Sequence, residues 1–190
     1  LAGLRLFHRL GMRICSFAWM RRTAYGDGAW ENDSRGGLTR LGHAAVAELN
    51  RLGIVTDVSH CSDQTTWDIL AASTRPVIAS HSNARAVTEQ PRNLTDDQLK
   101  QIAAKGGVVM INFGSAFLEQ KVYDQLQRAL ASVRPAYAKV KALPKKADRT
   151  AAQNTQAARH TEAMAFQTFR ALRLLVGRDT AGDVNDTSEA

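Results

Sequence analysis

The chain has 190 residues, and 44% of them are hydrophobic, which is ordinary for a soluble globular protein with its own core. Its uninterrupted apolar runs, such as residues 108–111, are far shorter than the ~18–20 residues of a membrane-spanning helix. Two cysteines are too few for a disulfide framework. We therefore predict no transmembrane segment and no fold held together by disulfides.

The positive charge is unevenly distributed along the chain. The formal net charge is +7, and residues 119–178 carry twelve Lys and Arg against four Asp and Glu. This segment lacks regularly interleaved aromatic residues and any nucleic-acid motif. We therefore predict solvated basic helix faces and no nucleic-acid partner.

The chain opens with a helix pattern over residues 1–10, followed by Gly11 at the carboxyl cap position. We expect four of its side chains to face the core: Leu4, Leu6, Phe7 and Leu10. Residues 12–18 are typical of a buried strand, and residues 19–37 form a polar loop long enough to line a site. Because the first residue is Leu1 and not Met, we expect an amino-terminal part to precede it.

Thr39 has the character of an amino cap for a helix over 40–52, and Gly53 closes that helix. Five apolar residues of the helix recur at helical spacing, namely Leu41, Ala45, Val46, Leu49 and Leu52.

A strand, a helix and a second strand follow within residues 54–79. Ser62 is a good amino cap, and Asp63 places a negative charge in the first turn of a helix over 63–73. Pro76 ends this unit, and the second strand begins after it. A right-handed crossover makes the two strands parallel.

A second long polar loop over 81–94 leads to Thr95 and Gln98, whose spacing is that of a capping box opening a helix over 96–105. Residues 108–113 are a further apolar strand. This alternation predicts an α/β fold with a parallel sheet, and the apolar runs without polar alternation predict strands covered on both faces.

The pattern changes to long helix over residues 119–176, where Pro135 and Pro144 are expected to break it. Residues 177–190 are polar and acidic and are expected to be disordered. The chain therefore divides into 1–118, 119–176 and 177–190.

Two Ser-His pairs, Ser59-His60 and Ser80-His81, stand where the two strands of the strand-helix-strand unit end. Parallel strands present their carboxyl ends at one edge of the sheet, and adjacent strands are about 4.8 Å apart. Side chains at the ends of such strands lie within roughly 5–10 Å of each other, and two neutral imidazoles that close can hold one or two metal ions. On the residues alone, satisfied polar histidines at strand ends are an equally good interpretation.

Three runs together carry a resemblance to a known family: GLTRLGHAAVAELNRLGIVTDVSHCS, PVIASHSNARAV and PRNLTDDQLKQIAAKGGVVMINF. They resemble the membrane dipeptidase (renal dipeptidase) family of zinc peptidases over roughly residues 1–118. The resemblance implies the central portion of a (β/α)8, TIM-like barrel, with 119–176 as a helical insertion or tail. It also implies dipeptide substrates and two zinc ions, and it allows a homodimer as the assembly.

By the same resemblance, His60 and His81 match the two histidines that bind the second zinc, and Arg92 matches the arginine that grips the substrate carboxylate. The family's other metal ligands lie before Leu1, and its late-strand aspartate has no match, so the catalytic residues are not identified. Trp19 aligns with a substrate-binding histidine of animal members. We therefore expect this chain alone to bind zinc weakly or not at all and to be inactive.

Structural interpretations are favoured for several other residues near the two histidines. Asp57 faces away from His60 by strand alternation. A role as an outer partner of another imidazole stays open for it, and a structural hydrogen bond is the favoured role. Cys61 is interpreted as a small buried thiol. Three acidic residues of the loop after the first strand are interpreted as solvated, although they lie within reach of the site: Asp27, Glu31 and Asp33.

Two other functions remain open at this point. The first is a metal-free binding or regulatory protein on the same scaffold, acting through the basic segment 119–176. The second is another amidohydrolase-like barrel that hydrolyses a different amide. The amino terminus that would indicate export or retention is absent from the sequence.

Overall fold

The structure is a computed structural model, and the residues that it describes are 1–142, 150, 153, 155 and 156. Contacts divide the chain into two compact units, Leu1–Gln120 and Lys121–Ala190. The elements of the first unit are α1 (Ala2–Arg9), β1 (Ile14–Cys15), the 3-10 helix η1 (Ala29–Ser34), α2 (Arg40–Leu52), β2 (Val55–Asp57), α3 (Asp63–Ala72), β3 (Val77–Ala79), α4 (Asp96–Ala104), β4 (Val108–Val109) and α5 (Ser115–Leu118). The helix α6 (Gln120–Lys141) follows.

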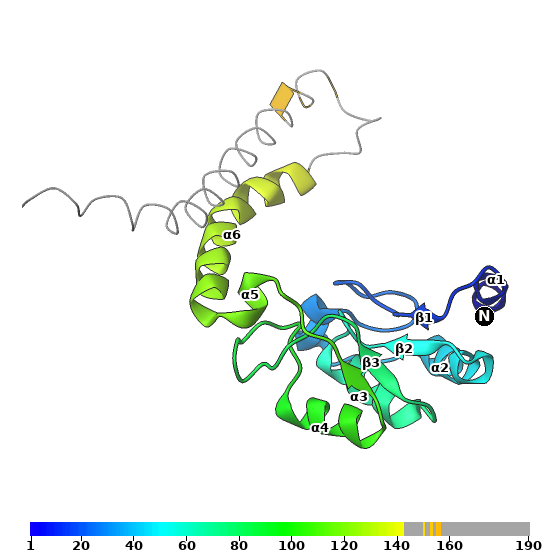
Figure 1. The fold of residues 1–190 in the computed structure, drawn as a ribbon. Helices are drawn as coiled ribbons and strands as arrows, with labels where there is room; N and C mark the ends of the chain where they lie inside the picture. Colours follow the sequence, from blue (N-terminus) through cyan, green and yellow to red (C-terminus); the bar gives the residue numbers. More distant parts are fainter. Residues whose placement is uncertain (143–149, 151–152, 154, 157–190) are drawn as a thin grey trace, which may run out of the picture. The chain divides into compact units, whose positions relative to one another are not determined.

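Four strands form one parallel sheet in the order β1-β2-β3-β4 (Figure 1). Thr56 lies opposite Val77, and Ile78 lies opposite Val108. The predicted α/β fold with a parallel sheet is confirmed. Since all four strands run the same way, the loops that follow them leave the same edge of the sheet.

Three helices of the first unit begin at the predicted caps. The side chains of Thr39, Ser62 and Thr95 accept hydrogen bonds from the third residue of α2, α3 and α4. The capping box of α4 is complete, and Gly53 ends α2 with a left-handed φ of 71°. These caps fix where each helix starts, and therefore the length of the loops that precede them.

The core lies between the sheet and the helices α2, α3 and α4, which pack against one another in chain order. The most deeply buried side chains include Val46, Leu49, Ile69, Val77, Ala79 and Ile102. Leu41 was expected to join them, but it is 40% exposed, because it begins the solvent-facing stripe of α2.

The predicted inward packing of the first helix is wrong for three of its four side chains. Leu4 is buried, whereas Leu6 and Phe7 are each 56% exposed and Leu10 is 73% exposed. The helix packs against α2 through one narrow stripe, in which Leu4 is buried and Arg5 pairs with Glu48 at 2.6 Å.

The outer strands are shorter than predicted. β1 covers two residues of the expected 12–18, and the Ser16 hydroxyl then donates to the carbonyls of Ala18 and Ser59. β4 covers two residues of the expected 108–113. After β1 the side-chain hydrogen bonds of Ser16 replace the sheet ladder, whereas just beyond β4 the Met110 N–H still donates to the Ala79 carbonyl at 2.8 Å.

Pro135 was expected to break the long helix, but α6 continues through it to Lys141. An interior proline normally kinks or breaks a helix, because it removes one backbone donor and its ring meets the carbonyl four residues before it, but here the helix includes Pro135. Pro144 and the tail 177–190 lie outside the described residues. No helix in the described part of the chain is both long and apolar enough to cross a bilayer.

Candidate metal centre

His60 and His81 lie side by side just beyond the carboxyl ends of β2 and β3. Their Nε2 atoms are 2.9 Å apart, and their ring centroids are 4.8 Å apart at an interplanar angle of 62°. The parallel pairing of β2 with β3 places the two loops together, as the sequence predicted.

His60 has an unusual backbone and two neighbours from the loop after β1. Its φ is 75°, in the left-handed region where residues other than glycine are uncommon. Its Nδ1 lies 3.3 Å from the sulfur of Met20. The ring of Trp19, which is 70% exposed, lies 5.9 Å away between centroids. The positive φ turns the His60 side chain toward this loop and toward His81.

A polar chain holds His81 from the opposite side. The Ser80 hydroxyl lies 2.6 Å from His81 Nδ1 and donates to the carboxylate of Asp57. Asp57 also accepts from the backbone N–H groups of Ser59 and Ser80, at 2.9 and 3.0 Å. Asp57 therefore makes the expected structural hydrogen bonds, and through Ser80 it also reaches an imidazole.

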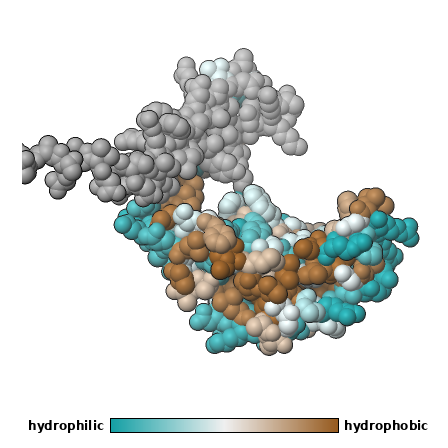
Figure 2. All heavy atoms as spheres, in the orientation of Figure 1, coloured by the Kyte–Doolittle hydropathy of each residue, from teal (hydrophilic) through white to brown (hydrophobic). Residues whose placement is uncertain are grey.

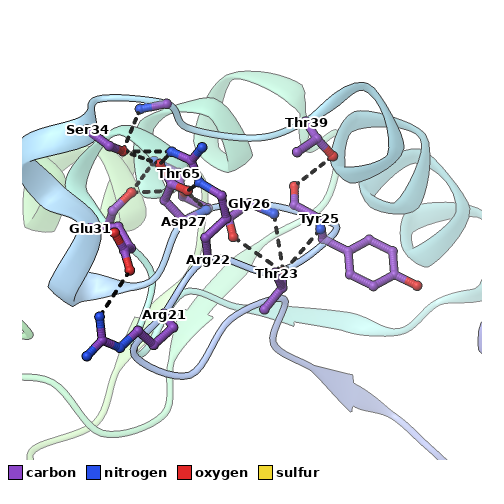
Figure 3. Close-up of polar contacts among 12 residues, drawn as sticks. Arg21, Arg22, Thr23, Tyr25, Gly26, Asp27, Glu31, Ser34, Thr39 and Thr65 are labelled. Atoms are coloured by element: carbon purple, nitrogen blue, oxygen red, sulfur yellow. Dashed lines mark hydrogen bonds and ion pairs between the residues drawn. The ribbon is translucent and has the colours of Figure 1, made fainter. Parts of the chain in front are cut away.

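An ion pair between the exposed Arg22 and the buried Asp27 lies in the loop that carries Met20 (Figure 3). Asp27 is 2% exposed and accepts hydrogen bonds from Arg22 and Ser34, while its backbone N–H donates to Thr65 at 3.0 Å. Burial alone would raise the pKa of Asp27, but the hydrogen bonds from Arg22 and Ser34 outweigh it and lower the pKa. Asp27 therefore has a structural role: its carboxylate holds Arg22 and Ser34 of the loop together, and its backbone N–H connects the loop to Thr65 on α3.

The same loop is bonded directly to the site. The Ala29 N–H donates to the His60 carbonyl at 2.8 Å, and the Trp30 N–H donates to the Met20 carbonyl at 2.9 Å. At Gly28 a Cβ atom would lie 2.4 Å from the Met20 backbone, so only glycine fits this approach. Glu31 pairs with Arg21 at 3.7 Å (Figure 3).

Arg92 lies beside the imidazole pair. Its Nη2 donates to the His81 carbonyl at 3.2 Å, and its guanidinium carbon lies 5.1 Å from the centroid of the Phe117 ring. Its Nε is buried and has no hydrogen-bond partner within the described part of the chain. A buried donor without a partner is costly, which makes this group a candidate for binding a ligand.

Arg85 holds the segment that carries Arg92, and the sequence analysis did not assign it this role. Its guanidinium donates two hydrogen bonds to Asp63, at 2.7 and 2.6 Å. It also donates to the carbonyls of Pro91 and Asn93, which flank Arg92. The acidic residue at the start of α3 is the one sequence signal for this clamp.

The environment keeps both imidazoles neutral. Burial, followed by the positive charge of Arg92, lowers the pKa of His60 to about 4 and also lowers the pKa of His81. Burial lowers the pKa of Arg92 to about 10, against the opposing charge of Asp57, so it stays a cation at neutral pH. Neutral imidazole is the form that binds a metal.

The donor set fits one edge of a metal site. Two nitrogen ligands of a tetrahedral zinc at 2.0–2.1 Å lie about 3.3 Å apart, close to the observed separation of the Nε2 atoms. Cys61 is 5% exposed, and burial raises the pKa of its thiol to about 12, so it is the expected buried thiol. The described residues contain no cluster of three or more His, Cys, Asp or Glu side chains suited to a metal. A complete metal site would therefore need ligands from outside the described residues.

Comparisons with known proteins point to one family. The chain is 42% identical over 111 residues to dipeptidase verJ of Clonostachys rogersoniana, covering 58% of this chain and 29% of that protein. It is 40% identical over 120 residues to an uncharacterised protein of the pqqA 5′ region of Klebsiella pneumoniae, covering 60% of this chain and 44% of that protein. The chain thus spans less than half the length of these relatives.

Two of the similar solved structures are also named as peptidases. A metallopeptidase from Rhodobacter sphaeroides, solved with a phosphinate mimic of the dipeptide L-Ala-D-Ala, is 42% identical with a TM-score of 0.60, covering 63% of this chain and 36% of that one. The probable dipeptidase PvdM of Pseudomonas aeruginosa is 25% identical with a TM-score of 0.61, covering 93% and 50%. The family model described as membrane dipeptidase (peptidase family M19) matches residues 1–179, and the chain therefore belongs to this family.

Proposed function

We propose that the full-length protein is a metal-dependent dipeptidase, in which His60 and His81 bind one zinc of a binuclear site and Arg92 binds the substrate carboxylate. The observation that carries this proposal is the pair of neutral imidazoles with Nε2 atoms 2.9 Å apart beside the half-buried cation of Arg92. A dipeptide offers both a scissile carbonyl and a free carboxylate, and the two halves of this site suit those groups.

Each residue contributes a separate part of the chemistry. His60 and His81 supply nitrogen ligands whose neutral state is maintained by burial and by Arg92. Arg92 presents an unpartnered Nε and a planar fork that suits a carboxylate. Zinc, when bound, supplies an activated water and polarises the scissile carbonyl.

We also propose that residues 1–118 form part of a (β/α)8 barrel and that 119–176 are a helical insertion. The four parallel strands and the division of the chain at Gln120 support this arrangement. One face of the sheet carries exposed apolar side chains, among them Ile14 at 52% and Val108 at 56%. This face is the barrel interior in the proposal, where the remaining strands cover it.

The first experiment measures zinc content and dipeptide hydrolysis of the full-length protein and of its His60→Ala and His81→Ala variants. We expect about two zincs per chain in the parent, as a two-metal hydrolase requires, and loss of metal and activity in both variants. His43→Ala is the matched control, because His43 is exposed on α2. A parent that binds no metal and hydrolyses nothing contradicts the proposal and favours the metal-free binding protein.

Arg92→Lys tests the substrate role separately. Lysine keeps the positive charge but loses the planar fork, so we expect KM for dipeptides to rise roughly 10–100-fold with zinc content unchanged. Arg75→Lys, on the loop before β3, is the control. An unchanged KM would remove Arg92 from the substrate site.

A further inference from the structure

We propose that Asp57, acting through Ser80, is a positioning residue that fixes His81 in the tautomer with its proton on Nδ1. The Nε2 lone pair of His81 then faces His60 before any ligand arrives. This inference rests on the proposed metal site for its purpose, but its geometry stands within the described residues alone.

The direction of the hydrogen bonds follows from the chemistry of the three groups. A carboxylate only accepts, so the single hydroxyl hydrogen of Ser80 is donated to Asp57. The Ser80 oxygen is then left as an acceptor 2.6 Å from His81 Nδ1. Nδ1 must therefore carry the proton, and Nε2 must be bare.

Asp57 is held firmly enough to impose this direction. It is 7% exposed and accepts from two backbone N–H groups as well as from the Ser80 hydroxyl. These donors belong to Ser59 after β2 and to Ser80 after β3, so the carboxylate joins the ends of both strands. Rotation of Asp57 away from Ser80 would break contacts on both strands at once.

His60 is held by different groups, and a hydrogen bond with the backbone of Trp19 is one of them. Its Nδ1 faces the thioether of Met20, which is only a weak acceptor. Without a metal, the single proton of neutral His60 can stay on Nε2 and be donated to His81 Nε2 across 2.9 Å. The two imidazoles therefore differ in what faces Nδ1: His81 meets a hydroxyl oriented by a carboxylate, and His60 meets a thioether.

The two Ser-His pairs supply an internal control. Ser59 does not contact an imidazole nitrogen; its hydroxyl accepts from the His81 backbone N–H at 3.0 Å and lies 3.3 Å from the Ser82 hydroxyl. Ser59→Ala therefore perturbs the backbone beside His81 and leaves the path from Asp57 to Nδ1 intact.

The test is 15N NMR of the histidine rings in the metal-stripped, full-length protein, with the His81 signals assigned through His81→Gln. We expect the Nδ1–H pattern for His81 in the parent and in Ser59→Ala. In Asp57→Asn the new amide can donate to Ser80, whose hydroxyl then donates to Nδ1, so the pattern should reverse to Nε2–H. Ser80→Ala should give a mixture, and Ser80→Thr should restore the parent pattern.

Zinc titration of the same proteins gives the second readout. Loss of an outer partner of a metal-binding histidine typically lowers metal affinity 10–100-fold, so we expect roughly that loss in Asp57→Asn and Ser80→Ala. Ser80→Thr and Ser59→Ala should stay within about threefold of the parent, because the outer partner is retained. Thermal unfolding confirms that each variant is folded.

The outcomes separate the two proposals. An Nε2–H pattern for His81 in the parent, or an unchanged pattern in Asp57→Asn, overturns the positioning role. The expected tautomers in a parent that binds no zinc support the positioning role and overturn the metal site instead.

Discussion

The two faces of the sheet differ sharply in what covers them. On the face toward α2, α3 and α4, Val77 and Ala79 are fully buried and Val58 is 1% exposed. On the other face, Ile14 and Val108 are each more than half exposed. Figure 2 shows hydrophobic residues running as a continuous band across the first unit, where Figure 1 shows the strands.

This difference shows what an apolar pattern can and cannot predict. Parallel sheets are normally covered on both faces, and the apolar runs of this chain fit that rule. The described residues supply the cover for one face only. The pattern therefore predicted that both faces are built for burial, but it contained no information about which segment covers the second.

The largest expected effect comes from opening the covered face. Leu49 on α2 is fully buried, so Leu49→Ala in the full-length protein should lower the free energy of unfolding by about 2–5 kcal/mol. Leu41→Ala on the same helix is the control, because Leu41 is 40% exposed. Urea unfolding measures both, and equal losses would mean that the helix layer is not the core.

A smaller effect sharpens the contrast between the faces. In the 190-residue chain, Val108→Ala should change stability by less than about 0.5 kcal/mol, because the side chain is already exposed. In the full-length protein the same change should cost about 1.5 kcal/mol, since two buried carbons are lost. Val77→Ala should cost the same in both, and equal small costs for Val108→Ala would contradict the barrel proposal.

Local features of the fold were predictable from the sequence. The caps at Thr39, Ser62 and Thr95 were correct because each depends on a hydrogen bond within three residues of the chain. For the first helix, Leu6, Phe7 and Leu10 were predicted to be buried but are exposed, because the packing of neighbouring elements decides which side of a helix is buried. Pro135 was predicted to break a helix that continues through it.

The same distinction holds at the candidate site. The proximity of His60 and His81 could be predicted from the sequence, because parallel topology alone places the ends of successive strands side by side. The partners of the two rings were predicted only in part: Asp57 was left open as a partner of an imidazole, whereas Met20 was not singled out. Met20 lies 40 residues before His60, and Asp57 lies 23 residues before Ser80, so both contacts depend on how distant loops fold.

The smallest expected effect concerns Glu48 and the two arginines that bind it on α1 and α2. Glu48 on α2 accepts hydrogen bonds from Arg51 and Arg5, which lower its pKa from 4.5 to about 2 and join α1 to α2. Between pH 4.5 and 2 the unfolded chain binds more protons than the folded one, so stability is present above this window and is lost as the pH falls through it.

Glu48→Gln should therefore flatten the decline of the unfolding temperature between pH 4.5 and 2, while leaving the slope above this window unchanged. Asp97→Asn is the control, because its pair with Lys100 is 3.5 Å long and both side chains are at least 78% exposed. If the unfolding temperature of Glu48→Gln falls between pH 4.5 and 2 as steeply as that of the parent, then α1 is held to α2 by Leu4 and its apolar contacts. The helices that cover the sheet would then depend little on the ion pairs of Glu48.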